Sequence, residues 1–437
     1  MPQLFRRCFH FKIKVLIVVS AILNYALIFF CVYFLGKRWS VLSDKLFWSA
    51  FIIRLIAGTA LGLVYSYYYS AGDTWSFFND AKIFSALARH DLTSYLNSLV
   101  DFSESQTIQS QLVNQEGRSI FFIKIISIFC LLGQDNYWIG AAYFSLLSFI
   151  CAWMLHREVI KKFPDAINES SLAFLFFPSV VFWSSGLEKE SIALCGIYFL
   201  AVVFLKVVSS TKPDKLFWLL IIPFSYVIWG LKYYWAIIFF DSIFTGLLIW
   251  FFSSRFSIVK KYSILFWTLS FFGMGMLLSF MHPNFYLDQF LGVIISNYND
   301  FAELSDPKNL IHYYQLEGTL TSMLINSPWA LFSGLFRPVI GEGHGLLGFA
   351  ASMENFLLLI LFIGASLNFK KLFTSSHHII LWTAISYCVI LCVFLALSTP
   401  NFGTLSRYRV GFLPFFAFLI AYRNPLVAWI FRQINNA

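Results

Sequence analysis

Charged residues are scarce in this chain. Asp, Glu, Lys and Arg make up 12% of its 437 residues, whereas hydrophobic residues make up 59% and 53 residues are Phe. A soluble protein could not keep so much apolar surface away from water. The composition therefore excludes an ordinary soluble enzyme and predicts an all-α, polytopic transmembrane protein.

Paired cysteine spacing, metal-ligand spacing and a Ser-His-Asp or Cys-His arrangement are also absent. The 7 Cys lie mostly within apolar runs and are predicted to be small hydrophobic side chains rather than disulfides or metal ligands. A triad mechanism is not predicted. A divalent cation is an optional cofactor, because Asp73, Asp80 and Glu190 could gather one although their spacing does not indicate it.

The net charge of +9 does not predict nucleic-acid binding, because Lys and Arg occur in short clusters between apolar runs. Membrane lipid headgroups are the expected partners. Five clusters mark the predicted cytoplasmic face, at residues 156–162, 206–215, 255–261, 370–371 and 423–432. The opposite face then carries residues 183–190, 231–235, 282–345 and 399–409.

Spans need about 20 mostly apolar residues each, and we predict about 11–13 of them in a single transmembrane domain, 1–437. The candidates are 15–35, 46–69, 137–155, 170–184, 188–208, 216–231, 233–252, 262–281, 346–367, 378–398 and 409–422. The first follows basic residues as a signal peptide would, but it is too long and lacks a cleavage site, so we expect it to remain as a span.

The run 119–132 decides the topology of the N-terminal quarter. If it lies flat on the membrane, residues 70–136 form an external loop with interfacial helices, but the basic N-terminus is external too. If it spans, the N-terminal charges face the cytoplasm and so does Asp73. We choose the first arrangement because it gathers the unusual polar features on one face. A second long external loop is predicted at 282–345.

Gly72-Asp73-Thr74-Trp75 follows the second apolar segment directly, after an aromatic end at 67–69. Tyr and Trp concentrate at membrane boundaries, so Asp73 is a carboxylate at the mouth of any cavity that the spans enclose. Apolar residues then recur at helical spacing, which predicts an amphipathic helix lying on the bilayer. Asp73 is either its N-cap or a proton acceptor, and the two roles are compatible.

A second polar segment, residues 177–190, interrupts the apolar runs. It contains Pro178-Ser179, then Gly186, and then Glu188-Lys189-Glu190 with no polar linker. Charges at the end of a span are tolerated where they line water or pair with one another. This segment is therefore either a ligand-binding turn or a tight hairpin stabilised by its own charges.

Single cations on the predicted external face form a third group. Lys232 lies in an aromatic turn and either holds a phosphate or extends to the interface. Arg407 and Arg409 lie on a face otherwise poor in basic residues and match a phosphate in bidentate fashion, or else anchor lipid headgroups. Arg337 resembles them, although the glycines that follow it at 341–345 also fit a flexible turn.

These features together resemble the GT-C class of integral membrane glycosyltransferases. They are the Gly-Asp pair after an early span, the interfacial helix, the short apolar helix ending at Gly133, the broken Pro-Ser span and Arg407-Tyr408-Arg409 before the last span. The resemblance implies that Asp73 is the base that deprotonates the acceptor. It also implies that Lys232, Arg407 and Arg409 bind the phosphate of a polyprenyl-linked sugar. The chain departs from that class in having Asp73-Thr74 instead of Asp-Glu, after the second span rather than the first.

The predicted function is therefore transfer of a sugar from a polyprenyl-phosphate-linked donor to a glycan or lipid acceptor, for synthesis of cell-envelope polysaccharide or glycoconjugate. The donor's phosphate is a fair leaving group, so fixed cations and a base suffice. The expected location is the bacterial inner membrane. The alternative is a lipid-linked glycan polymerase or ligase that uses Arg337, His344 and Arg407. A transporter or flippase is less favoured, because a convincing second broken repeat is missing.

Overall fold

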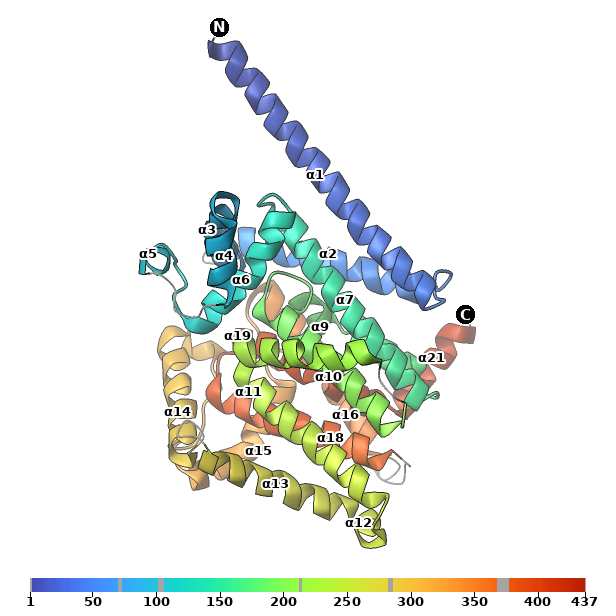
Figure 1. Cartoon of the computed structure of the whole chain (residues 1–437). Coiled ribbons are helices and arrows are strands. Elements are labelled where there is room, and N and C mark those ends of the chain that lie inside the picture. Colours follow the sequence, from blue (N-terminus) through green and yellow to red (C-terminus); the bar gives the residue numbers. More distant parts are fainter. Residues whose placement is uncertain are drawn as a thin grey trace. The chain divides into compact units, whose positions relative to one another are not determined.

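The computed structural model describes residues 2–69, 73–100, 106–211, 214–281, 286–367 and 377–436 (Figure 1). Among these residues the only regular structure outside helices is an antiparallel bridge between Leu310 and Asn401. The predicted all-α fold is confirmed. Gly72 and the basic pair Lys370-Lys371 lie outside the described residues.

Helices make up almost all of the regular structure in both halves of the chain. The first half has α1 (Pro2–Arg38), α2 (Lys45–Tyr67), α3 (Asp73–His90), α4 (Leu92–Val100), α5 (Gln106–Gln109), α6 (Gly117–Leu132), α7 (Tyr137–Lys162), α8 (Ile167–Ser170), the π-helix η1 (Ser171–Phe176), α9 (Pro178–Trp183) and α10 (Lys189–Val208). The second half has α11 (Lys215–Ser253), α12 (Ser257–Lys261), α13 (Ser263–Met281), α14 (Leu287–Leu304), α15 (Leu320–Phe336), α16 (Gly345–Ser366), α18 (His378–Ser398), α19 (Phe402–Tyr408), α20 (Leu413–Ala421) and α21 (Pro425–Asn436), with 3-10 turns η3 (Pro307–Asn309) and η4 (Arg409–Gly411).

In the described part of the chain, 7 helices are long and apolar enough to cross a membrane. They are α1 from Val18 onward, α2, α7, α10, α11, α16 and α18. The helices α20 and α21 meet at an 80° bend and would make an eighth span if they act as one. The chain is therefore a multi-pass membrane protein.

The described part of the chain has fewer candidate spans than the 11–13 predicted, because some of the shorter apolar runs do not form separate long helices. Residues 170–184 are divided among α8, η1 and α9. Residues 216–231 and 233–252 both fall in α11, whose backbone leaves helical geometry at Lys232 (φ −144°, ψ 65°). An unbroken helix of that length would extend about 58 Å, roughly twice the ~30 Å hydrocarbon core. The break at Lys232 thus divides α11 into two segments, each close to the length of one span.

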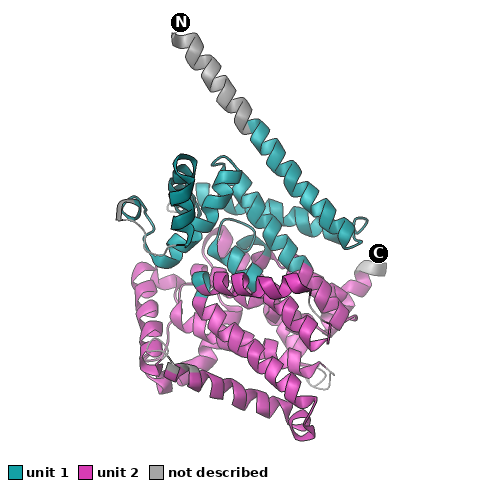
Figure 2. Ribbon diagram, in the orientation of Figure 1, with its two compact units in different colours: residues 1–153, 181–196, 230–232 teal, residues 154–180, 197–229, 233–437 magenta. Residues whose placement is uncertain are grey.

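The chain forms two compact units (Figure 2). Unit 1 contains residues 1–153, 181–196 and 230–232, and unit 2 contains residues 154–180, 197–229 and 233–437. Each unit has its own apolar core and its own set of buried charged side chains.

The core of unit 1 joins α2 to α7 through aromatic side chains. The ring of Phe47 in α2 lies 5.1 Å from Phe149 and 5.0 Å from Trp153 in α7, both edge-on. Further along α2, Gly58 approaches the backbone carbonyl of Ser185 so closely that a Cβ there would overlap it. This contact brings α2 directly against the turn that precedes α10.

The amphipathic helix predicted after Asp73 is present as α3. Its apolar positions Phe77, Phe78, Ala81 and Phe84 are buried as the helical spacing predicts. The prediction that this face lies on the bilayer was wrong, because α3 packs against α6 and the ring of Phe77 meets that of Phe122 edge-on at 5.4 Å. Protein side chains, instead of lipid, cover the apolar face of α3.

The core of unit 2 is built from α15, α16, α18 and α20. Gly334 in α15 lies against Cys392 in α18, and the ring of Phe336 packs beside Phe362 of α16 and Phe416 of α20. Cys392 is one of 6 described cysteines, which are all free thiols. The side chain of Cys8 lies outside the described residues.

Candidate functional site

The start of α10 carries a buried charged turn, residues 184–190. Glu188 and Glu190 are completely buried. The turn is closed by its own hydroxyls, because Ser185 donates to the carbonyl of Val181 and Ser191 donates to that of Gly186 at 2.6 Å. The carboxylates are therefore held in a rigid turn at the end of a membrane span, where buried charges need partners within the protein.

Lys232 provides one partner for this turn. Its ammonium lies 2.6 Å from a carboxylate oxygen of Glu190, and both side chains are almost fully buried. The helical break at Lys232 separates the two halves of α11, so the pair joins that break to the start of α10. A lysine held in this way can bind a phosphate only by giving up its ion pair with Glu190, which makes it a weaker phosphate ligand than the sequence predicted.

Arg54 is a second buried cation beside the turn, and it was not among the residues predicted from the sequence. Its guanidinium donates to the hydroxyls of Ser148 at 2.5 Å and Ser184 at 2.9 Å. The available signal was an arginine inside the apolar run 46–69, since an ionisable residue within a span generally has a specific partner or function.

The N-terminus of α3 packs onto the same turn. Thr74 is fully buried, donates to the carbonyl of Leu187 at 2.8 Å and shares a hydrogen bond of 2.9 Å with the hydroxyl of Tyr137. Trp75 stacks on Tyr137 at 3.9 Å. These contacts bring together the beginnings of α3, α7 and α10 in unit 1.

Asp73 is the first residue of α3 and is exposed. A negative charge in the first turn of a helix is favoured by the helix dipole. Its neighbour Thr74 is bonded to the charged turn, so the carboxylate lies next to that turn while remaining open to solvent. Asp73 therefore has the exposure that a proton acceptor for an incoming substrate requires.

Lys189 is a half-buried cation of unit 1 that meets a hydroxyl and an aromatic ring. Its ammonium donates to the hydroxyl of Ser119 at 2.9 Å and lies 4.6 Å from the centre of the Phe77 ring. It makes no ion pair within the residues that the structure describes. Phe77 follows Asp73 by four residues, so the two lie on one face of α3, about one helical turn (~5.4 Å) apart. The cation and the exposed carboxylate thus approach the same face of α3.

Arg337 lies in unit 2 and is bound by Glu342. Its guanidinium donates two hydrogen bonds from Nε, at 3.1 and 3.0 Å, and one from Nη2, at 2.7 Å. The guanidinium also lies over the rings of Trp329 and Phe402. Burial alone would raise the pKa of Glu342, but hydrogen bonds from Arg337 and from the Val339 amide lower it overall.

This pair predicts a pH dependence of stability. A carboxylate whose pKa is lowered by folding adds stability above its unfolded pKa, about 4.3 for Glu, and that stability is lost as pH falls through the folded value. At neutral pH we expect Glu342→Gln to destabilise the protein by about 1.5 kcal/mol, the lower end of the range for hydrogen bonds to charged groups. Thermal unfolding in detergent should show the gap to wild type closing below about pH 4.3. A gap that stays constant down to acid pH would contradict this account.

Arg409 is the centre of a second network in unit 2. It is 1% exposed, and it donates to the side-chain oxygen of Asn355 at 2.6 Å and to Glu354 at 3.1 Å. Glu354 also accepts from the backbone amide and hydroxyl of Ser179, at 2.8 and 2.6 Å. Asn355 donates to the carbonyl of Pro338 at 2.9 Å. Neither partner was predicted from the sequence, although Glu354 is the sole charged residue in α16.

The structure thus separates the predicted site residues into two groups. Asp73, Glu188, Lys189 and Lys232 belong to unit 1, and Arg337, Arg407 and Arg409 belong to unit 2. The guanidinium of Arg407 lies 5.4 Å from the ring centre of its neighbour Tyr408. His344 is exposed just before α16.

The metal-binding cluster considered from the sequence does not form. Among the described residues no group of three or more His, Cys, Asp or Glu side chains could hold a metal ion. Asp80 instead accepts hydrogen bonds from the backbone amides of Val113 and Asn114, at 3.1 and 2.9 Å. That carboxylate ties the loop before α6 to α3.

Comparison with protein-family models, curated proteins and solved structures finds no match to this chain.

Proposed function

We propose that this chain is a membrane glycosyltransferase that moves a sugar from a polyprenyl-phosphate-linked donor to an acceptor at the external face, with its site at the charged turn of unit 1. The acceptor is a glycan or lipid of the cell envelope. The observation that carries the proposal is the placement of Lys189, a half-buried ammonium with a hydroxyl and a ring as partners, on the face of α3 that begins with exposed Asp73.

The chemistry needs a cation where negative charge develops and a base where a proton is lost. As the bond between sugar and phosphate breaks, charge accumulates on the departing phosphate oxygens. Lys189 is suited to that position, because its ammonium can donate to phosphate without breaking an ion pair. Asp73 accepts the proton of the acceptor hydroxyl. Glu190 with Lys232 holds the turn in place.

The polymerase or ligase alternative has less support from the geometry. It relies on Arg337, whose guanidinium is engaged by Glu342 through three hydrogen bonds. A phosphate would have to displace that carboxylate before binding. Lys189, by contrast, makes no ion pair or hydrogen bond with a carboxylate among the described residues.

A reconstituted assay distinguishes the two functions. The purified protein in proteoliposomes is given radiolabelled polyprenyl monophosphate sugars, or polyprenyl diphosphate oligosaccharides, with an extract of envelope glycolipids and glycans as acceptor. We expect turnover of a monophosphate sugar, with release of polyprenyl phosphate and label in the acceptor. Elongation that uses only the diphosphate oligosaccharides would instead establish the polymerase or ligase function and overturn the proposal.

Lys189→Met should lower kcat/KM for the monophosphate donor by about 10- to 100-fold, which corresponds to the loss of a charge-assisted hydrogen bond. Lys189→Arg should retain part of the activity because it keeps the charge. Lys82→Met is the matched control, since Lys82 also lies over a phenylalanine of α3, at 5.6 Å from the Phe78 ring centre. Equal losses in Lys189→Met and Lys82→Met would contradict a specific role for Lys189.

A further inference from the structure

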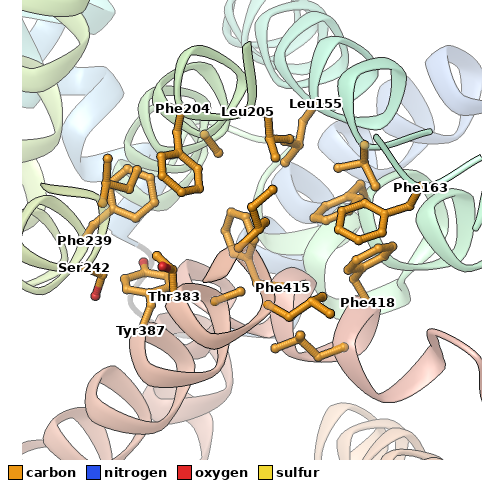
Figure 3. Close-up of a pocket in the computed structure, with 18 residues that line it drawn as sticks. Leu155, Phe163, Phe204, Leu205, Phe239, Ser242, Thr383, Tyr387, Phe415 and Phe418 are labelled. Carbon is orange, nitrogen blue, oxygen red and sulfur yellow. The ribbon is translucent and has the colours of Figure 1, made fainter. Parts of the chain in front are cut away.

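Unit 2 contains an apolar cavity that the proposed transfer reaction does not use. It has a volume of about 70 Å³ and lies among α7, α10, α11, α18 and α20 (Figure 3). One water needs only about 10–15 Å³, so the space is several times larger than a single water molecule requires. Phenylalanine rings converge on it from several helices, including Phe204, Phe239 and Phe415.

The polar groups in the cavity lining already have partners within unit 2. Ser242 donates to the carbonyl of Ile238 at 2.7 Å, and Tyr387 donates to that of Gly411 at 2.9 Å. Thr383 accepts from the indole of Trp267 at 3.0 Å. Water in the cavity would find few bonding partners, and a polar ligand would be poorly satisfied. The lining therefore favours a hydrocarbon ligand over water or a polar ligand.

The surrounding helices indicate where that hydrocarbon comes from. Four of them, α7, α10, α11 and α18, are candidate membrane spans. The cavity residues Phe163, Leu205 and Ile380 lie near the end of α7, the end of α10 and the beginning of α18. The last turns of α7 and α10 carry the basic residues Lys161, Lys162 and Lys206. The cavity thus lies toward the end of unit 2 that carries Lys161, Lys162 and Lys206, which we call the basic end.

The basic end carries a cation suited to a phosphate. Lys162 precedes the cavity residue Phe163, is half-buried, and has no partner among the described residues. Its neighbour Lys161 is exposed and pairs with Glu158 at 2.7 Å, and Lys206 lies 3.5 Å from the same carboxylate. Lys162 is therefore a half-buried cation, without an ion pair among the described residues, that directly precedes a residue lining the cavity.

We infer that this cavity holds an acyl chain of an anionic glycerophospholipid from the leaflet at the basic face, with Lys162 binding the lipid phosphate. Charge complementarity selects an anionic headgroup, and the satisfied polar lining selects a hydrocarbon tail. The lipid would fill the space among the five helices and stabilise their packing. This site is independent of the charged turn in unit 1.

Photocrosslinking tests the inference on the full-length protein. Phosphatidylglycerol with a diazirine among the first carbons of one acyl chain is reconstituted with the protein, and labelled peptides are mapped after irradiation. We expect labelling of α18 and α20 at cavity positions, competed by unlabelled phosphatidylglycerol better than by phosphatidylcholine. Labelling confined to positions outside the cavity, or equal competition by both lipids, would overturn the inference.

Three variants sharpen the test. Lys162→Gln should weaken competition by phosphatidylglycerol about fivefold, the contribution of one lysine at an anionic surface, whereas Lys161→Gln should leave it unchanged. Ala384→Phe places a ring in the cavity and should abolish cavity labelling. If that variant does not fold, Lys162→Gln and the competition by phosphatidylcholine still decide. Preferential labelling by a diazirine polyprenyl phosphate would assign the cavity to an isoprenoid substrate and overturn the phospholipid assignment.

Discussion

Asp73→Asn is expected to reduce kcat for sugar transfer by about 10²- to 10⁴-fold, the range associated with loss of a general base. The amide keeps the size of the side chain but cannot accept a proton from the acceptor hydroxyl. Binding of the donor should change little, because Lys189 and not Asp73 is assigned to the phosphate. The measurement is steady-state transfer in proteoliposomes, with kcat and KM determined separately.

The control for Asp73→Asn must separate catalysis from a structural role at the start of a helix. Asp91 serves this purpose, because it is an exposed aspartate that accepts hydrogen bonds from the backbone amides of Thr93 and Ser94 at the start of α4. Asp91→Asn should leave kcat unchanged. If Asp73→Asn retains most of the wild-type kcat, or if both variants lose it equally, Asp73 is a helix-terminal residue and not the base.

Glu354→Gln should destabilise the protein by about 3–5 kcal/mol, because it leaves the buried charge of Arg409 without its carboxylate. Arg409 is 1% exposed, so water cannot replace the lost interaction. The same substitution weakens two hydrogen bonds from Ser179, which join the start of α9 to α16. Thermal unfolding of the purified protein in detergent would show a large drop in midpoint and a smaller yield of folded monomer.

Asp165→Asn provides the matched comparison for Glu354→Gln. Asp165 also pairs with an arginine, Arg423, at 3.2 Å, but those side chains are 51% and 42% exposed. An exposed pair contributes at most about 1 kcal/mol. Combining Glu354→Gln with Arg409→Met should recover much of the lost stability, since no buried charge is then left uncompensated. Similar stability losses in Glu354→Gln and Asp165→Asn would contradict the network.

The long apolar helices were predictable from the sequence nearly to the residue. Runs 188–208, 346–367 and 378–398 correspond to α10, α16 and α18. The requirement for about 20 apolar residues in a span is local, so no knowledge of neighbouring helices is needed. The shorter run 170–184 was predicted as one span, but it forms a π-helix followed by a short α-helix that begins at Pro178.

The candidate site was predicted only in part. Asp73, Glu188, Lys189 and Lys232 were recognised because charge next to an apolar run is conspicuous in the sequence. The partners of Arg409 were not recognised, since Glu354 is 55 residues away along the chain. The apolar face of α3 was assigned to lipid because an amphipathic helix looks the same whether protein or membrane covers it.

By itself, the sequence determined that this protein is helical, crosses the membrane several times, and carries several of its unusual charges beside apolar runs. Those properties follow from the free-energy cost of exposing apolar residues to water and charges to hydrocarbon. That cost depends on the residues of each segment alone. Only the tertiary structure decided which charges neutralise one another and which cations remain available. Lys232 is held by Glu190 and Arg337 by Glu342, whereas Lys189 meets a hydroxyl and a ring. For Lys232 and Lys189 that outcome depends on residues far apart in sequence, because a buried charge is stabilised by whichever group folding brings within a few ångströms.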